Sequence, residues 1–172
     1  MGNKFNKAIA VNVLPHSLTH LKFGHDFNQP IEVDVLPRSL THLRFGTNFN
    51  KLIKVDVLPV NLTHLDFGYD FNQPIAVGVL PPSLTFVNVG ETFCQPIQKD
   101  VLPCRLTHFE AGSRVIEPMS NVPGSLGVGG GTIHLDRKWI QPIKEDMLPD
   151  SLNMSTSTEP TWFEWYQHDR MW

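Results

Sequence analysis

Residues 58–75 read Leu58-Pro59-Val60-Asn61-Leu62-Thr63-His64-Leu65-Asp66-Phe67-Gly68-Tyr69-Asp70-Phe71-Asn72-Gln73-Pro74-Ile75, and the same unit recurs along most of the chain. Leu-Pro begins at positions 14, 36, 58, 80 and 102, and Phe-Asn begins at 5, 27, 49 and 71, so both motifs recur with a constant offset of 22. A strict period between about 20 and 50 is typical of proteins built from stacked coils. The repeat therefore predicts a solenoid in which equivalent residues of successive units lie above one another.

Each unit is expected to contain two short strands. In the first, residues 31–35, apolar and polar side chains alternate and the β-branched ones face inward; its equivalents are 9–13, 53–57, 75–79 and 97–101. The second reads His20-Leu21-Lys22-Phe23, which puts Leu21 and Phe23 on one face and His20 and Lys22 on the other. The prolines in both links leave no uninterrupted amphipathic window of ~10 residues, so little or no regular helix is expected.

Stacking of the coils predicts buried columns of equivalent residues. The apolar columns are Leu14/36/58/80/102, Leu18/40/62/84/106, Phe23/45/67 and Phe27/49/71/93. The glycine column at 24, 46, 68, 90 and 112 indicates a turn with positive φ or a close backbone approach. The asparagine column at 28, 50 and 72 predicts a ladder of side-chain amides that satisfies turn carbonyls.

The string Leu-Pro-x-Ser-Leu-Thr-His-Leu-x-Phe-Gly-x-x-Phe-Asn-Gln-Pro-Ile resembles the FNIP repeat, which is named for its Phe-Asn-x-Pro core and is similar to the leucine-rich repeats. The resemblance covers about residues 5 to 149. It implies a leucine-rich-repeat-like solenoid with short parallel strands and a sheet on its concave side. In some relatives FNIP repeats are joined to an F-box, which implies a substrate receptor of a ubiquitin ligase. Since the repeats here begin at Phe5, we expect no F-box in this chain.

The repeat becomes irregular after residue 109. Val122-Pro123 follows Leu102-Pro103 at an offset of 20, and the next Leu-Pro, at 148, follows at an offset of 26, so four residues have been added; the glycine-rich run 124–131 is the expected place. We expect residues 1–153 to form the solenoid and 154–172 to form a polar connector and an aromatic tail. The tail either caps the last coil or docks in a groove of another protein.

The composition excludes several classes of function. A net charge of −3 and a pI near 6.2 argue against a nucleic-acid surface. Neither a signal peptide nor a membrane-spanning window is evident, and two cysteines make no disulfide framework, so we expect a cytoplasmic protein. No nucleophile elbow, His-Glu-x-x-His motif or phosphate-binding glycine loop is present. We therefore expect no enzyme activity and no cofactor.

A column of histidines, interrupted by Phe86, runs along the second strands at positions 20, 42, 64 and 108. Zinc sites usually mix cysteine and histidine in a tetrahedral set, whereas duplication of a coil produces a column of one residue type, so no metal is expected. Repulsion between adjacent imidazolium ions should lower the pKa values of these histidines. The fold is then expected to lose stability as the pH falls from about 6.5 to 5.

Other positions differ from coil to coil while the apolar columns stay constant, which is expected of the face of a solenoid that carries specificity. We expect a non-enzymatic scaffold that binds an unknown protein partner, with ubiquitin-ligase components among the candidates, and that binds neither nucleic acid nor membrane. The alternatives are a free-standing remnant of an F-box/FNIP receptor and a structural repeat protein without a specific ligand. The candidate partner-binding residues are His20, Lys22, His42, Arg44, His64, Asp66, Tyr69, Asn88, Glu91 and Glu110. The change from basic Lys22 to acidic Glu110 indicates a partner of opposite polarity.

Overall fold

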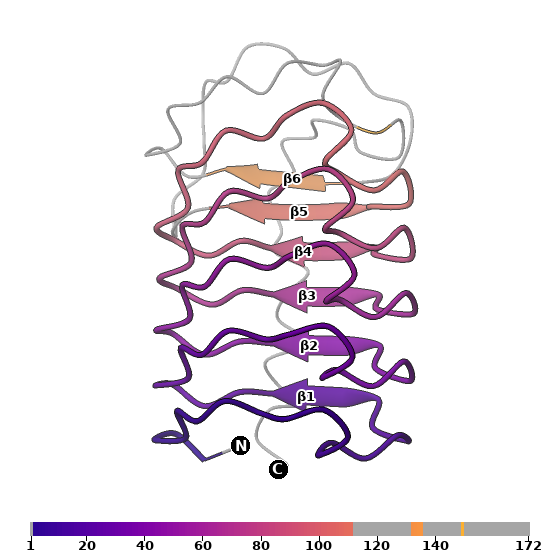
Figure 1. Cartoon of the computed structure of the whole chain (residues 1–172). Coiled ribbons are helices and arrows are strands. Elements are labelled where there is room, and N and C mark those ends of the chain that lie inside the picture. The colour runs from indigo at the N-terminus through magenta and orange to yellow at the C-terminus, as the bar shows by residue number, and fades with distance from the viewer. Residues whose placement is uncertain (1, 112–131, 136–148, 150–172) are drawn as a thin grey trace.

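The computed structural model describes residues 2–111, 132–135 and 149. It contains one parallel sheet in which the strands follow one another in chain order (Figure 1). The strands are β1 (His20–Lys22), β2 (His42–Arg44), β3 (His64–Asp66), β4 (Phe86–Asn88), β5 (His108–Ala111) and β6 (Thr132–Leu135). From β1 to β5 each strand residue pairs with its equivalent in the next repeat, which confirms the predicted solenoid.

The described residues form no helix. None of this part of the chain therefore makes a helix with the length and hydrophobicity needed to cross a bilayer. The tail at 154–172 and its two predicted roles lie outside the described residues.

The spacing changes between β5 and β6, where His108 pairs with Thr132 and the offset in numbering becomes 24. The step of 20 from Leu102 to Val122 and the four added residues together make the same offset of 24. The insertion expected at 124–131 thus precedes β6 in the chain. Since the strands on both sides of it remain paired in parallel, the sheet continues past the irregular stretch.

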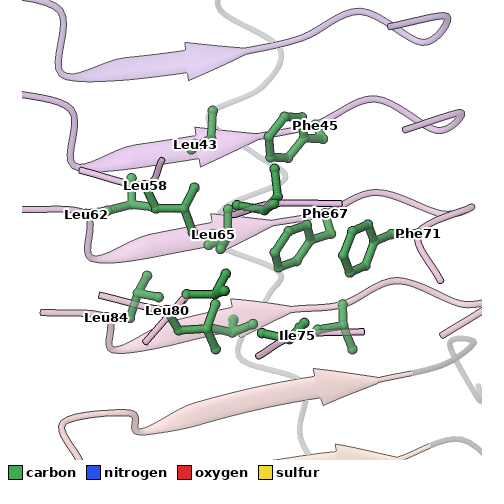
Figure 2. Packing of buried hydrophobic residues seen from close by; sticks show 14 of the residues in the cluster. Leu43, Phe45, Leu58, Leu62, Leu65, Phe67, Phe71, Ile75, Leu80 and Leu84 are labelled. Carbon is green, nitrogen blue, oxygen red and sulfur yellow. The ribbon is translucent and has the colours of Figure 1, made fainter. Parts of the chain in front are cut away.

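The core includes the predicted columns, and its side chains lie together on one side of the sheet (Figure 2). The middle residue of each strand from β1 to β4 is buried, and the leucines and phenylalanines of successive coils pack on one another. Phe45 and Phe49 of one coil stack with ring centroids 3.8 Å apart, and Phe49 lies 6.1 Å from Phe27 on one side and from Phe71 on the other. Since each coil buries its apolar side chains against its neighbours, the coils stabilise one another.

The prediction that residues 31–35 and their equivalents form a first strand in each unit is wrong. Residues 33 and 34 form a turn, in which Asp34 has φ of +64° and the Val35 N–H donates to the Glu32 carbonyl at 3.3 Å. A positive φ is incompatible with an extended strand. Ile31 and Val35 are buried, but Val33 between them is 43% exposed, so the alternation is that of a turn with two apolar anchors.

The left-handed conformation recurs at the same place in five successive coils, at Asn12, Asp34, Asp56, Gly78 and Asp100, with φ between +64° and +83°. Asparagine, aspartate and glycine are the residue types that adopt it most readily. The aspartates at 34, 56 and 100 are exposed. Their identity is therefore explained by backbone conformation and requires no bound ion.

The glycine column is explained by close approach of successive backbones. A Cβ added to Gly24, Gly46, Gly68 or Gly90 would collide with the carbonyl oxygen of the equivalent glycine in the preceding coil. Positive φ occurs at only two of these, Gly68 and Gly90. In both, the N–H donates to the side chain two residues earlier, to Asp66 Oδ1 at 2.9 Å or to Asn88 Oδ1 at 2.8 Å. These hydrogen bonds hold the turn in place.

The asparagine column forms a ladder, but with the opposite polarity to the prediction. Each side-chain oxygen accepts a backbone N–H of the next coil: Asn28 N–H donates to Asn6, Asn50 N–H to Asn28, Asn72 N–H to Asn50 and Cys94 N–H to Asn72, at 2.9–3.0 Å. Turn N–H groups, and not turn carbonyls, are thus satisfied. The ladder links each of these coils to its neighbour beside the phenylalanine core.

Substituting Asn50 with alanine should lower the free energy of unfolding by about 1–3 kcal/mol, because the part-buried Asn72 N–H loses its acceptor. Gln73 Nε2, which donates to the same oxygen at 2.9 Å, loses it as well. Urea unfolding measures the change. Asn50→Asp retains an acceptor oxygen and serves as the control; equal losses in the two variants would contradict the role given to this oxygen.

Candidate functional site

Eight of the ten candidate residues lie on one surface. The first and third residues of β1 to β4 are more exposed than the buried middle residue, so they lie on the side of the sheet away from the core. We call this surface the sheet face. It carries two adjacent columns, His20/His42/His64/Phe86/His108 and Lys22/Arg44/Asp66/Asn88/Glu110. Tyr69 and Glu91 lie beyond the strands, in the turns that follow β3 and β4.

The rings of the first column stack along the solenoid. His20 and His42 have centroids 4.2 Å apart, and His42 and His64 have centroids 4.3 Å apart, with the planes within 12° of parallel. Phe86 continues the stack at 5.9 Å from His64. The column is therefore a continuous row of aromatic rings on the sheet face.

A threonine next to the ring fixes its orientation in three of the coils. Thr41 Oγ1 donates to the Thr19 carbonyl at 3.1 Å and lies 2.8 Å from His42 Nδ1. The same pair of contacts is made by Thr63 with His64 and by Thr107 with His108. The sequence repeats Thr-His at these positions, and this adjacency is the signal that sequence reasoning overlooked.

These contacts determine the tautomer of the imidazoles. A threonine hydroxyl has a single proton. Since Thr41 donates that proton to a carbonyl, its oxygen must accept from His42, so Nδ1 carries the hydrogen. Nε2 of the neutral ring is then the hydrogen-bond acceptor. The same argument applies to His64 and His108. The row therefore combines aromatic rings with acceptor nitrogens of fixed identity.

The pKa values of the two central histidines are lowered, as the sequence predicted, but chiefly for a different reason. Burial lowers the pKa of His42 to about 4, with repulsion from His64 and His20 as the smaller causes. Burial also lowers the pKa of His64, followed by repulsion from His108 and His20. Both rings are therefore neutral at pH 7, which agrees with the tautomer argument.

The fold should lose stability as the pH falls from 6.5 to about 4, a window that extends below the predicted one. Unfolded imidazoles bind a proton near pH 6.5, whereas His42 and His64 in the fold resist protonation, so acid favours the unfolded state. Between pH 7 and 4.5 we expect the free energy of unfolding to decrease by about 1–2 kcal/mol, less than full linkage because solvent screens the half-exposed rings. Urea unfolding at successive pH values measures it.

The chain itself supplies the control, because Phe86 occupies the histidine position in β4. His42→Phe should keep the stack and reduce the pH dependence. If the variant and the parent protein responded identically to acid, the protonation of His42 would play no part.

The second column is partly committed to internal contacts. Arg44 Nε lies 3.2 Å from Asp66 Oδ2 on the neighbouring strand, and both side chains are partly buried. Asp66 and Asn88 also hold the N–H groups of the following glycines. The charges of Arg44 and Asp66 therefore partly neutralise each other within the column. The residue types at 66 and 88 therefore also serve the geometry of the following turn.

Among the described residues, no group of three or more histidine, cysteine, aspartate or glutamate side chains is arranged to hold a metal ion. Cys94 and Cys104 are both exposed free thiols.

Comparison with known proteins places this geometry in a family. No curated protein matches the chain. Among solved structures it is similar to CroV588, described as a novel circular leucine-rich-repeat protein, with 40% sequence identity and a TM-score of 0.68. The match covers 87% of this chain but only 25% of CroV588, so this chain spans about a quarter of that protein's length. The model of the FNIP repeat matches residues 5–48, 49–92 and 71–114. The chain therefore belongs to the FNIP repeat family and has a leucine-rich-repeat-like solenoid fold.

Proposed function

We propose that the chain is a non-enzymatic cytoplasmic scaffold that binds a protein partner through the sheet face. The observation that carries the proposal is the gathering of eight chemically varied side chains, from five parallel strands, on one continuous surface. A rigid sheet holds them in register, which lowers the entropy that binding must overcome. The exposed free thiols of Cys94 and Cys104 fit a reducing compartment.

The chemistry of the face indicates what the partner presents. The Nε2 atoms of His42, His64 and His108 accept hydrogen bonds, so the partner offers N–H or O–H donors opposite this row. It carries an acidic group near Lys22 and a basic group near Glu110. A partner held by neutral imidazoles is released in acid, since a protonated Nε2 becomes a donor and repels the same groups.

Binding by face variants of the full chain tests the proposal. A partner isolated from cells of the organism that encodes the chain is titrated against the double variant Lys22→Ser/Glu110→Ser, and we expect its affinity to fall at least tenfold. The matched control is Glu32→Ser/Lys54→Ser, which removes an exposed ion pair of one acid and one base in the turns away from the strands. If the control weakened binding as much, or the face variant bound normally, the sheet face would not be the binding surface.

A further inference from the structure

A column of exposed valines runs along one row of turns. It consists of equivalent residues of four successive coils, each 43–54% exposed: Val11, Val33, Val55 and Val77. The column is continuous from coil to coil, since the Val55 side chain lies 3.9 Å from the place that a Cβ on Gly78 would take. In the fifth coil Lys99 occupies the position and ends the apolar row. A contiguous apolar row of this kind is typical of an interaction surface.

The position before each valine adds a second exposed column. It holds Ala10, Glu32, Lys54 and Ala76, one in each of the same four coils. Glu32 Oε2 and Lys54 Nζ lie 3.2 Å apart, and at least 60% of each side chain is exposed. The two columns therefore carry one acid and one base at their middle, with neutral residues on both sides. Leu52, which is 51% exposed, extends the apolar surface. We call the two columns together with Leu52 the valine strip.

The order of charges in the valine strip is complementary to itself when it is reversed. From the first coil to the fourth, the second column is neutral, acidic, basic and neutral. A copy that runs in the opposite direction presents neutral, basic, acidic and neutral residues, so each charge meets its opposite. The valine column is the same in both directions. A twofold contact between identical chains requires a surface with this self-complementarity.

We propose that the valine strip binds a second copy of this chain in an antiparallel twofold dimer. Glu32 faces the partner's Lys54 and Lys54 faces the partner's Glu32, so four charges of alternating sign lie at the centre. The valines cover one another and contribute affinity, while the charges determine orientation. Asp34 and Asp56 follow the valines at the tips of the turns and lie at the border of the contact, where water screens their repulsion.

The contact uses no residue of the sheet face, so it goes beyond the proposed function and does not depend on it. Sedimentation velocity of the full chain, from about 1 to about 200 µM, tests it because dimer formation depends on concentration. The mean mass should rise from that of the 19.5 kDa chain to twice that value and no further, since a twofold contact closes on itself. A parent protein that stays monomeric throughout, or that grows beyond a dimer, would overturn the proposal.

Reversing the two charges tests how the copies are paired. Glu32→Lys produces a strip with two bases and Lys54→Glu a strip with two acids, so each variant alone should have a dissociation constant at least tenfold higher. Mixed in equal amounts, the two variants should associate like the parent protein, because every charge again meets its opposite across the contact. Urea unfolding at the lowest concentration verifies that each variant is folded. A mixture that associates as weakly as the separate variants would contradict the antiparallel pairing.

The chain offers matched controls for charge and for hydrophobic contact. Lys99→Glu reverses an exposed lysine in the fifth coil, beyond the valine strip. Leu52→Ser should raise the dissociation constant at least about threefold, whereas Val60→Ser, at a 64% exposed position outside the strip, should leave it unchanged. Both controls should dimerise like the parent protein. If either control weakened dimerisation as much as its matched variant, the valine strip would not be the contact.

Discussion

Replacing Gly46 with alanine is expected to lower the free energy of unfolding by about 3–4 kcal/mol, a large effect for the addition of one methyl group. The new Cβ would collide with the Gly24 carbonyl oxygen and its carbon, which belong to the backbone of the coil below. No side chain can rotate to relieve this contact. The two coils must separate, and the strands and the asparagine ladder between them would be strained. Urea unfolding of the purified variant gives the change directly.

Gly78 provides the comparison, because its need for glycine comes from conformation and not from close approach. It has φ of +83°, but its added Cβ would come no closer than 3.9 Å to the Val55 side chain. Gly78→Ala should therefore cost about 1 kcal/mol, the effect of conformation alone. If the two substitutions were equally destabilising, close approach of the coils would not explain the glycine column.

Phe49→Ala is expected to lower the free energy of unfolding by about 3–5 kcal/mol. Phe49 has no exposed surface and contacts rings within its own coil and in the coils on both sides. Its removal opens a cavity in the middle of the stack, where neither neighbour can move without disturbing a strand. Since small domains have total stabilities of about 5–15 kcal/mol, we expect partial unfolding at about 37 °C. Circular dichroism during heating, together with urea unfolding, measures both effects.

Tyr69→Ala is the matched aromatic substitution outside the core, since this side chain is 47% exposed. A change within about 0.5 kcal/mol is expected for it. A comparable loss at Tyr69, or a loss below about 1 kcal/mol at Phe49, would mean that the phenylalanine columns do not carry the stability of the stack.

The arrangement of the coils could be predicted from the sequence because stacking demands the same residue at the same place. The Leu, Phe and Gly columns recur from coil to coil, and the structure buries the apolar ones as expected. The parallel sheet and its register followed from the same count of 22. The contacts between coils recur at a fixed offset in the sequence, so a single sequence was sufficient to predict them.

What could not be predicted depends on backbone dihedral angles and hydrogen-bond direction. The segment from Ile31 to Val35 alternates like a strand, and only the recurrence of Asn, Asp or Gly at position 34 and its equivalents signals a left-handed turn. The asparagine ladder was expected, but residue type does not say whether the amide oxygen or the amide nitrogen is used. The threonines that precede His42, His64 and His108 determine the tautomer of each ring, and the sequence does not show which group receives the hydroxyl proton.

Most of the candidate residues share one face, but some of them also make contacts within the chain that the sequence pattern does not show. Lys22, Arg44 and Asp66 do form one column, yet Arg44 pairs with Asp66, and Asp66 also holds a glycine N–H. Whether a side chain on the face also makes such internal contacts depends on the distance between coils and on the length of the side chain. A pattern of variable residues therefore indicates a surface, while contacts decide how much of it is available for recognition.

The constant offset between paired strands has a consequence for growth of the molecule. Duplication of one unit adds one rung, lengthens the body by about 4.8 Å and leaves all remaining contacts unaltered. The length of the solenoid can thus change in fixed increments. Each added unit also brings another pair of outward side chains, so one duplication extends both the length of the solenoid and its surface for recognition.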